Sequence, residues 1–80
     1  MNIHPSPWAY PLSYPEAWLK NGTVTATLQD LKNQCLDGFF KPGNQVYVYE
    51  EPDTEFYLIS KNRKAWFSIF SDQIKIHEQP

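Results

Sequence analysis

A chain of 80 residues forms one small domain, and its single cysteine cannot close an internal disulfide. The formal net charge of −2 argues against a general nucleic-acid binder, which carries a basic excess. No apolar run is long enough to cross a membrane, and no basic segment followed by an apolar run marks a leader, so we expect a cytoplasmic protein with no membrane partner. In that reducing compartment we expect Cys35 to be a small buried residue.

The first 22 residues differ in composition from the rest of the chain. Four prolines lie between positions 5 and 15, which excludes a regular helix or a central strand there. Aromatic side chains such as Trp8 and Tyr10 alternate with these prolines, so we expect an extended arm that packs on its own domain. After the arm, residues 16–20 predict one helical turn that Asn21-Gly22 ends. We therefore divide the chain into an arm at 1–22 and a folded domain at 23–80.

The next segment has two interpretations. Residues 23–28 alternate polar and apolar side chains, which predicts a strand followed by a long irregular loop. The alternative is a helix that begins at Thr27, with Asp30 as its capping-box partner and Gly38 as its stop. Its apolar stripe would consist of Leu28, Leu31, Cys35 and Leu36. Periodicity leaves both open, and we favour the strand because of the segments that follow.

The remainder of the chain reads as short strands separated by turns. The segment Lys41–Asn44 predicts a tight turn, because proline presets one backbone dihedral and glycine supplies another. Strands are then predicted at 45–50, 56–60, 65–69 and 74–77, with a polar hairpin at 61–64 and a single turn at 70–73. In the first of these, Val46 and Val48 point to the core and the tyrosines to the other face. Five short strands with at most one short helix predict an all-β fold, a small five-stranded barrel.

Four segments in this order resemble the Src-homology-3 (SH3) family. Thr27–Leu31 is similar to the opening motif of those domains, and Phe40–Val46 to their first turn and strand. Ala65-Trp66-Phe67 resembles their Gly-Trp-Phe strand, and Ser71–Lys75 falls where they have a one-turn helix and a closing strand. The resemblance implies an SH3-like barrel over about two-thirds of the chain.

The resemblance also implies a function, with one departure. SH3 domains bind proline-rich segments on a shelf of aromatic side chains. Phe56 stands at the family's ligand-binding tryptophan, whereas Gln29, Leu31 and Gln73 replace the tyrosines of the shelf. The resemblance therefore implies the fold and a binding activity more directly than it implies the peptide groove that is usual in the family.

Acidic residues gather in the predicted loops. Asp37 lies where the family places acids against a ligand arginine, and Glu50, Glu51, Asp53 and Glu55 crowd the next loop. One interpretation is a solvated loop that protects a sheet edge from aggregation. The other is an electrostatic patch that steers a basic partner surface toward the domain.

Nothing in the sequence forms a catalytic constellation. His4, His77 and Cys35 are not brought together by any sequence pattern, and the glycines are scattered turn residues rather than a phosphate loop. We therefore expect a protein that is not an enzyme and that needs no metal or other cofactor.

The leading hypothesis is a protein-interaction module, that is, a small adaptor, accessory subunit or inhibitor. Its predicted partner-binding residues are Trp8, Tyr10, Asp37, Tyr47, Tyr49, Glu50, Glu51, Asp53, Glu55, Phe56 and Tyr57. Exchange of the N-terminal arm would make a homodimer. One alternative is a single-stranded nucleic-acid binder that uses Tyr47, Tyr49 and Tyr57 beside the basic hairpin, a partner that the net charge disfavours. The other is a structural component of a larger assembly.

Overall fold

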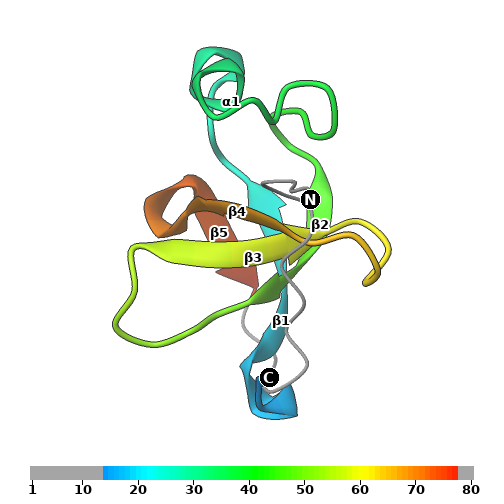
Figure 1. Ribbon diagram of the computed structural model, residues 1–80, viewed down its shortest axis with the longest axis vertical. Coiled ribbons are helices and arrows are strands. Elements are labelled where there is room, and N and C mark those ends of the chain that lie inside the picture. The colour runs from blue at the N-terminus through cyan, green and yellow to red at the C-terminus, as the bar shows by residue number, and fades with distance from the viewer. Residues whose placement is uncertain (1–13, 78–80) are drawn as a thin grey trace, which may run out of the picture.

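The computed structural model describes residues 14–77; the predicted arm lies mostly outside this range. The described chain forms one antiparallel sheet of five strands in the order β4-β3-β2-β1-β5 (Figure 1). The strands are β1 (Leu19–Val24), β2 (Gln45–Tyr49), β3 (Phe56–Ser60), β4 (Phe67–Phe70) and β5 (Ile74–His77). The helical elements are the single helix α1 (Leu28–Asn33) and the 3-10 turns η1 (Glu16–Trp18) and η2 (Ser71–Gln73). The predicted all-β class is confirmed.

The sheet curls back on itself because of how its edges are connected. Its two edge strands, β4 and β5, are consecutive in the chain and are joined by the three residues of η2. The concave side encloses the core, and α1 and the following loop close one end of it (Figure 1). The core cluster consists of Val24, Ala26, Leu31, Leu36, Phe40, Val46, Val48, Ile59, Phe67, Ile69 and Ile74.

A second set of packed side chains lies outside this core. The rings of Trp18 and Tyr14 are 5.3 Å apart, those of Tyr14 and Tyr49 are 5.5 Å apart, and those of Tyr49 and Trp66 are 4.9 Å apart. We call these four residues the outer aromatic cluster. Trp66 is buried but belongs to this cluster and not to the barrel interior, because its neighbour Phe67 fills the inward position. Tyr49, one of the predicted partner-binding residues, is also buried and so is not exposed to a partner.

The first strand begins earlier than the sequence predicts. The helical turn ends at Trp18, and β1 then runs through Asn21-Gly22, which we had expected to end a helix. Gly22 is buried between β2 and β5, and a Cβ there would lie 2.9 Å from both the Lys75 carbonyl oxygen and a Val48 methyl. The glycine therefore allows a close approach of neighbouring strands and does not form a turn.

The strand predicted at 23–28 is present only as far as Val24, and the segment predicted as an irregular loop after it contains the helix α1. The helical alternative is therefore right, but the helix ends at Asn33 and not at Gly38. Thr27 and Asp30 form a complete capping box: the Asp30 amide donates to Thr27 Oγ1 and the Thr27 amide donates to Asp30 Oδ2, both at 3.0 Å. The helix ends in a Schellman motif, in which the Leu36 amide donates to the Leu31 carbonyl and the Cys35 amide to the Lys32 carbonyl.

Cys35 occupies the residue of this motif that takes a left-handed conformation, with a φ of 61°. Its side chain is exposed, so the prediction of a buried cysteine is wrong. The buried contact of the motif is instead made by Leu31 and Leu36, which both belong to the core cluster. The predicted apolar stripe is therefore half right, because Leu28 is also exposed.

The later predictions need little correction. The turn at Lys41–Asn44 is present, with Gly43 at a φ of 91° and the Asn44 amide donating to the Lys41 carbonyl. The strands at 56–60 and 74–77 and the polar hairpin at 61–64 are confirmed, and the strand predicted at 65–69 is displaced to Phe67–Phe70. Within residues 14–77, no helix is long and apolar enough to cross a membrane.

Candidate binding site

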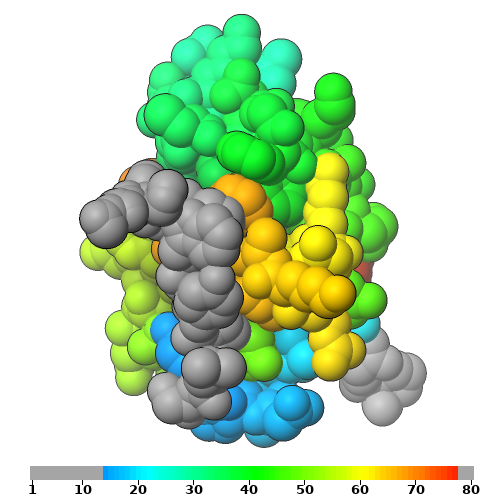
Figure 2. All heavy atoms as spheres, turned by 45° about the vertical axis from the view of Figure 1, so that its right-hand side comes forward, coloured from blue at the N-terminus to red at the C-terminus, as the bar shows by residue number. Residues whose placement is uncertain are grey.

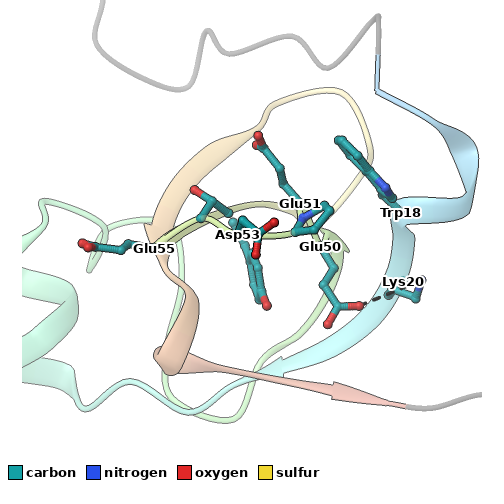
Figure 3. Close-up of a pocket in the computed structure, with 9 residues that line it drawn as sticks. Trp18, Lys20, Glu50, Glu51, Asp53 and Glu55 are labelled. Atoms are coloured by element: carbon teal, nitrogen blue, oxygen red, sulfur yellow. Dashed lines mark ion pairs between the residues drawn. The ribbon is translucent and has the colours of Figure 1, made fainter.

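An open hollow lies where the loop between β2 and β3 faces the start of β1. Its volume is about 530 Å³. In Figure 3, Trp18 and Lys20 come from the β1 side and the acidic side chains from the loop. The lining residues are Trp18, Lys20, Glu50, Glu51, Pro52, Asp53, Thr54, Glu55 and Tyr57. We call this site the acidic hollow.

Local backbone chemistry gives the loop its shape. Pro52 presets its own φ, and Asp53 follows at a φ of 59°, a region that aspartate tolerates better than most residues. The chain returns to β3 at Phe56, whose amide donates to Thr54 Oγ1 at 3.2 Å. The loop therefore turns sharply and keeps its carboxylates at the surface.

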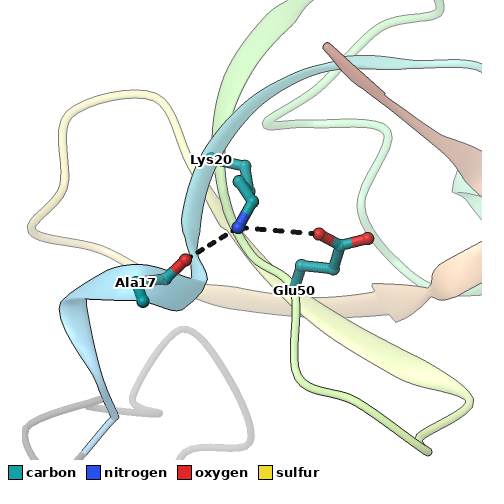
Figure 4. Close-up of polar contacts among 3 residues, drawn as sticks. All are labelled: Ala17, Lys20 and Glu50. Atoms are coloured by element: carbon teal, nitrogen blue, oxygen red, sulfur yellow. Dashed lines mark hydrogen bonds and ion pairs between the residues drawn. The ribbon is translucent and has the colours of Figure 1, made fainter. Parts of the chain in front are cut away.

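The acidic hollow already contains one cation. Lys20 Nζ donates to the Ala17 carbonyl oxygen at 2.7 Å and lies 3.9 Å from Glu50 Oε1 (Figure 4). The lining thus has four carboxylates and one ammonium group. The Glu50 carboxylate points toward Lys20, whereas Glu55 points away from the other labelled side chains (Figure 3). Because both partners of this ion pair are partly exposed, solvent screens their attraction.

Two tyrosines beside the acidic loop have raised pKa values. Burial raises the pKa of Tyr14, and so do a hydrogen bond that its hydroxyl donates to Glu51 Oε1 at 3.0 Å and the charge of that carboxylate. Burial also raises the pKa of Tyr57, with a further contribution from the charge of Glu50. Each phenol therefore keeps its proton in more alkaline solution than a free tyrosine does.

A stacked pair of exposed phenylalanines lies where β3 and β4 meet the acidic loop. Phe56 and Phe70 are opposite each other in β3 and β4, with ring centroids 4.8 Å apart and an interplanar angle of 29°. They are 45% and 40% exposed, which is unusual for neighbouring large apolar side chains. The Ser71 amide donates to the Glu55 carbonyl at 2.7 Å and so fixes this end of β4 to the acidic loop.

The structure gathers only part of the predicted site. Five of the predicted residues line the acidic hollow: Glu50, Glu51, Asp53, Glu55 and Tyr57. Phe56 stands between Glu55 and Tyr57 in the chain but does not line the hollow. Tyr57 lies on the opposite face of the sheet from Tyr49, because its neighbour Leu58 is the residue that pairs with Tyr49.

The other predicted residues lie elsewhere. Tyr47 is half-buried under Arg63, and Asp37 is exposed in the connection between α1 and β2, outside the lining of the acidic hollow. The three tyrosines of the nucleic-acid hypothesis therefore do not form one exposed face. Trp8 and Tyr10 fall outside the described residues, as does the predicted arm exchange.

Sequence reasoning missed Trp18, Lys20 and Phe70. Trp18 and Lys20 reach the hollow because β1 pairs with β2. The sequence did not predict this pairing, because Asn21-Gly22 is typical of the end of a helical turn. Phe70 had a visible signal, because the alternation of the buried Phe67 and Ile69 places Ser68 and Phe70 on the outer face.

No three His, Cys, Asp or Glu side chains between positions 14 and 77 gather as metal ligands. No protein-family model matches the chain, and no curated protein or solved structure matches it. The function is therefore inferred from the geometry of the acidic hollow and of the phenylalanine pair.

Proposed function

We propose that this chain is a non-catalytic protein-interaction module, that is, a small adaptor, accessory subunit or inhibitor. It binds a basic segment of a partner protein in the acidic hollow, and an apolar residue of the same segment packs on the Phe56–Phe70 pair. The observation that carries the proposal is the arrangement of four carboxylates around the rings of Trp18 and Tyr57 in one open hollow.

This arrangement suits an arginine or lysine side chain. The cationic head gains attraction from the carboxylates and from an aromatic face, and its aliphatic stem packs on the rings. Lys20 supports the proposal, because it shows that an ammonium group is accommodated beside Glu50. Loop carboxylates at the surface also steer a basic partner, which raises the association rate more than the affinity.

The proposal includes an SH3-like barrel as the scaffold. It is supported by the 3-10 turn η2 directly before the closing strand β5, as the resemblance implied for this position. Phe56 takes the place of the family's ligand-binding tryptophan, and Phe70 provides a second ring beside it. The opening motif departs from the family pattern, because Thr27–Leu31 is the start of a helix and not a strand.

The test is a titration of the full chain with a labelled peptide in which two arginines flank prolines and leucines. We expect saturable binding that weakens about five-fold in the double variant Glu50→Gln/Asp53→Asn, because exposed ion pairs each contribute modestly. Phe56→Ala should also weaken binding. Lys20→Gln should strengthen it, because the variant removes the internal competitor for Glu50.

Two matched variants control for a general loss of negative charge. Asp37→Asn and Asp72→Asn each remove an exposed carboxylate that does not line the acidic hollow. An equal loss of binding in these controls, or no saturable binding of the peptide, would contradict the proposal. Tighter binding of single-stranded oligothymidylate than of the peptide would favour the nucleic-acid hypothesis instead.

A further inference from the structure

The opposite end of β3 carries a second hollow of different chemistry. Its volume is about 250 Å³, and its lining is mainly apolar: Phe39, Phe40, Lys61, Asn62, Ala65 and Phe67. In Figure 2, the segment around residue 40 (green) and the hairpin at 61–64 (yellow) lie side by side on this face. Phe39 is 53% exposed and rests on Phe67, with ring centroids 4.7 Å apart. We call this site the apolar hollow.

The hairpin that borders the apolar hollow carries three cations, of which Lys61 lines the hollow itself. Lys61 Nζ lies 5.5 Å from the centroid of the Phe40 ring, and Arg63 Cζ lies 5.6 Å from that of Tyr47. Together with Lys64, these residues give three positive charges on one hairpin, and residues 56–71 contain no aspartate or glutamate. The one ion pair found within residues 14–77 joins Lys20 to Glu50 and involves none of the three.

Lys61 also borders a more polar hollow of about 260 Å³. Its other lining residues are Asn21, Gln45, Val46 and Tyr47. One ammonium group thus stands between an apolar hollow and a polar one. A ligand that places an apolar group in the first and an anionic group beside it would use both.

The hairpin is held in place by buried and local hydrogen bonds. Ser60 is fully buried, and its Oγ accepts from the amides of Asn62 and Arg63 at 3.1 and 2.8 Å. Asn62 Oδ1 accepts from the amides of Lys64 and Ala65 at 2.8 and 3.1 Å. Arg63 has a φ of 65°, a conformation that favours glycine, so the hairpin holds a charged side chain where a glycine would relieve strain.

We propose that this end of the molecule is a second binding surface, which takes an acidic peptide segment carrying one large apolar side chain. The apolar side chain enters the apolar hollow, and flanking carboxylates meet Lys61, Arg63 and Lys64. Charge complementarity selects an acidic partner. A peptide fits better than a nucleic acid because the hollow is concave and one ring face of Phe39 is already covered by Phe67, whereas base stacking needs open, flat rings.

The test uses fluorescence anisotropy with the full chain and the labelled peptide Asp-Asp-Glu-Phe-Asp-Asp. We expect the dissociation constant to rise about ten-fold when alanine replaces the phenylalanine of the peptide, because burial of that ring is lost. Ala65→Leu fills the apolar hollow without changing charge and should weaken binding by a similar factor. Amide chemical shifts should change at residues 39–40 and 61–67 and not at the acidic hollow.

Further variants separate binding from folding. Arg63→Gly removes one cation and relieves the backbone strain, so it should weaken binding at an unchanged or higher melting temperature. Lys32→Gln and Lys75→Gln remove exposed cations elsewhere in the chain and should leave the dissociation constant within about two-fold of the parent. Glu50→Gln/Asp53→Asn should leave binding of the acidic peptide intact, so this proposal does not depend on the proposed function.

Three results would overturn the inference. The first is equal binding of the phenylalanine and alanine peptides, which would mean that the apolar hollow takes no side chain. The second is displacement of the peptide by oligothymidylate at lower concentration, which would make the occupant a nucleic acid. The third is a mass that rises with protein concentration and falls back in Glu50→Gln/Asp53→Asn, which would make the occupant the acidic loop of a second copy.

Discussion

The two ends of β3 differ in how their loops are held as well as in charge. The basic hairpin is fixed by five hydrogen bonds that involve the side chains of Ser60 and Asn62. The acidic loop is fixed at its two ends by backbone hydrogen bonds, from the Glu50 amide to the Trp18 carbonyl and from the Ser71 amide to the Glu55 carbonyl. Its carboxylates add the Tyr14–Glu51 hydrogen bond and the Lys20–Glu50 ion pair. The Lys20–Glu50 ion pair should weaken as salt rises, whereas the hydrogen bonds of the basic hairpin involve no charged side chain and should not.

One contact supports both ends. Tyr49 precedes the acidic loop and Trp66 follows the basic hairpin, and their rings are 4.9 Å apart. The outer aromatic cluster is therefore the place where a single substitution should disturb both loops. Substitutions outside this cluster should disturb only one of the two loops.

Trp66→Ala should have the largest effect. Loss of this buried side chain should lower the free energy of unfolding by about 3–5 kcal/mol, which is a large part of the stability of so small a domain. Urea denaturation measures the change. Phe39→Ala is the matched control, because Phe39 is more than half exposed and should cost much less. A loss in Trp66→Ala as small as the one expected for Phe39→Ala would mean that the outer aromatic cluster does not stabilise the fold.

Ser60→Ala should destabilise the basic hairpin and leave the acidic loop unchanged. Removal of the hydroxyl leaves two backbone amides of the basic hairpin without their acceptor, at a cost of about 1–3 kcal/mol. Faster amide exchange should appear at residues 62–65 and not at 50–55. Ser68→Ala is the control, because Ser68 is exposed on the neighbouring strand. Faster exchange at both ends would show that the loops are coupled through β3.

Strands in which buried and exposed side chains alternate could be predicted from the sequence. Strands that depend on contacts with distant residues could not. Val46 and Val48 alternate with tyrosines, so β2 could be read from five residues. At β1 the local signal of Asn21-Gly22 is a turn, and only the packing of Gly22 against Val48 and Lys75, which are remote in sequence, makes it a strand. The capping box of α1 was visible, but the resemblance to a strand-opened domain outweighed it.

The residues of the candidate site also fall into those that local sequence predicts and those that depend on distant contacts. The carboxylates of the acidic loop are neighbours in the sequence, so their grouping could be predicted. Trp18 and Lys20 join them only through the register of β1 on β2. The burial of Tyr49 could not be read from its strand, because Tyr14 and Trp66, which contact its ring, come from other parts of the chain.

Each end of β3 also contains one charged residue in a left-handed conformation, Asp53 in the acidic loop and Arg63 in the basic hairpin. Replacing either with glycine should raise the free energy of unfolding by up to about 1 kcal/mol, because the steric cost of positive φ is removed. Asp53→Gly should weaken only the basic peptide, and Arg63→Gly only the acidic one. Cys35→Gly relieves the same strain at the end of α1 and should affect neither peptide. Loss of both activities in one variant would contradict two independent surfaces.

The smallest expected effect concerns pH and the acidic loop alone. The pKa of Tyr57 is raised by burial and by the charge of Glu50, so the unfolded chain loses this proton before the folded protein does. The contribution of Tyr57 to stability is therefore complete below about pH 10 and is lost as pH rises through the folded pKa. Glu50→Gln should lower the pKa of Tyr57 and reduce this alkaline loss, as ultraviolet titration and urea denaturation at several pH values would measure. Tyr57→Phe identifies the transition that belongs to this residue.

The basic hairpin provides the control for this pH effect. It contains no tyrosine and its hydrogen bonds involve no carboxylate, so Ser60→Ala should leave the slope of stability against pH unchanged. An alkaline loss that persists in full in Glu50→Gln would show that burial alone sets the pKa of Tyr57, and that the acidic hollow has a weaker field than its four carboxylates imply.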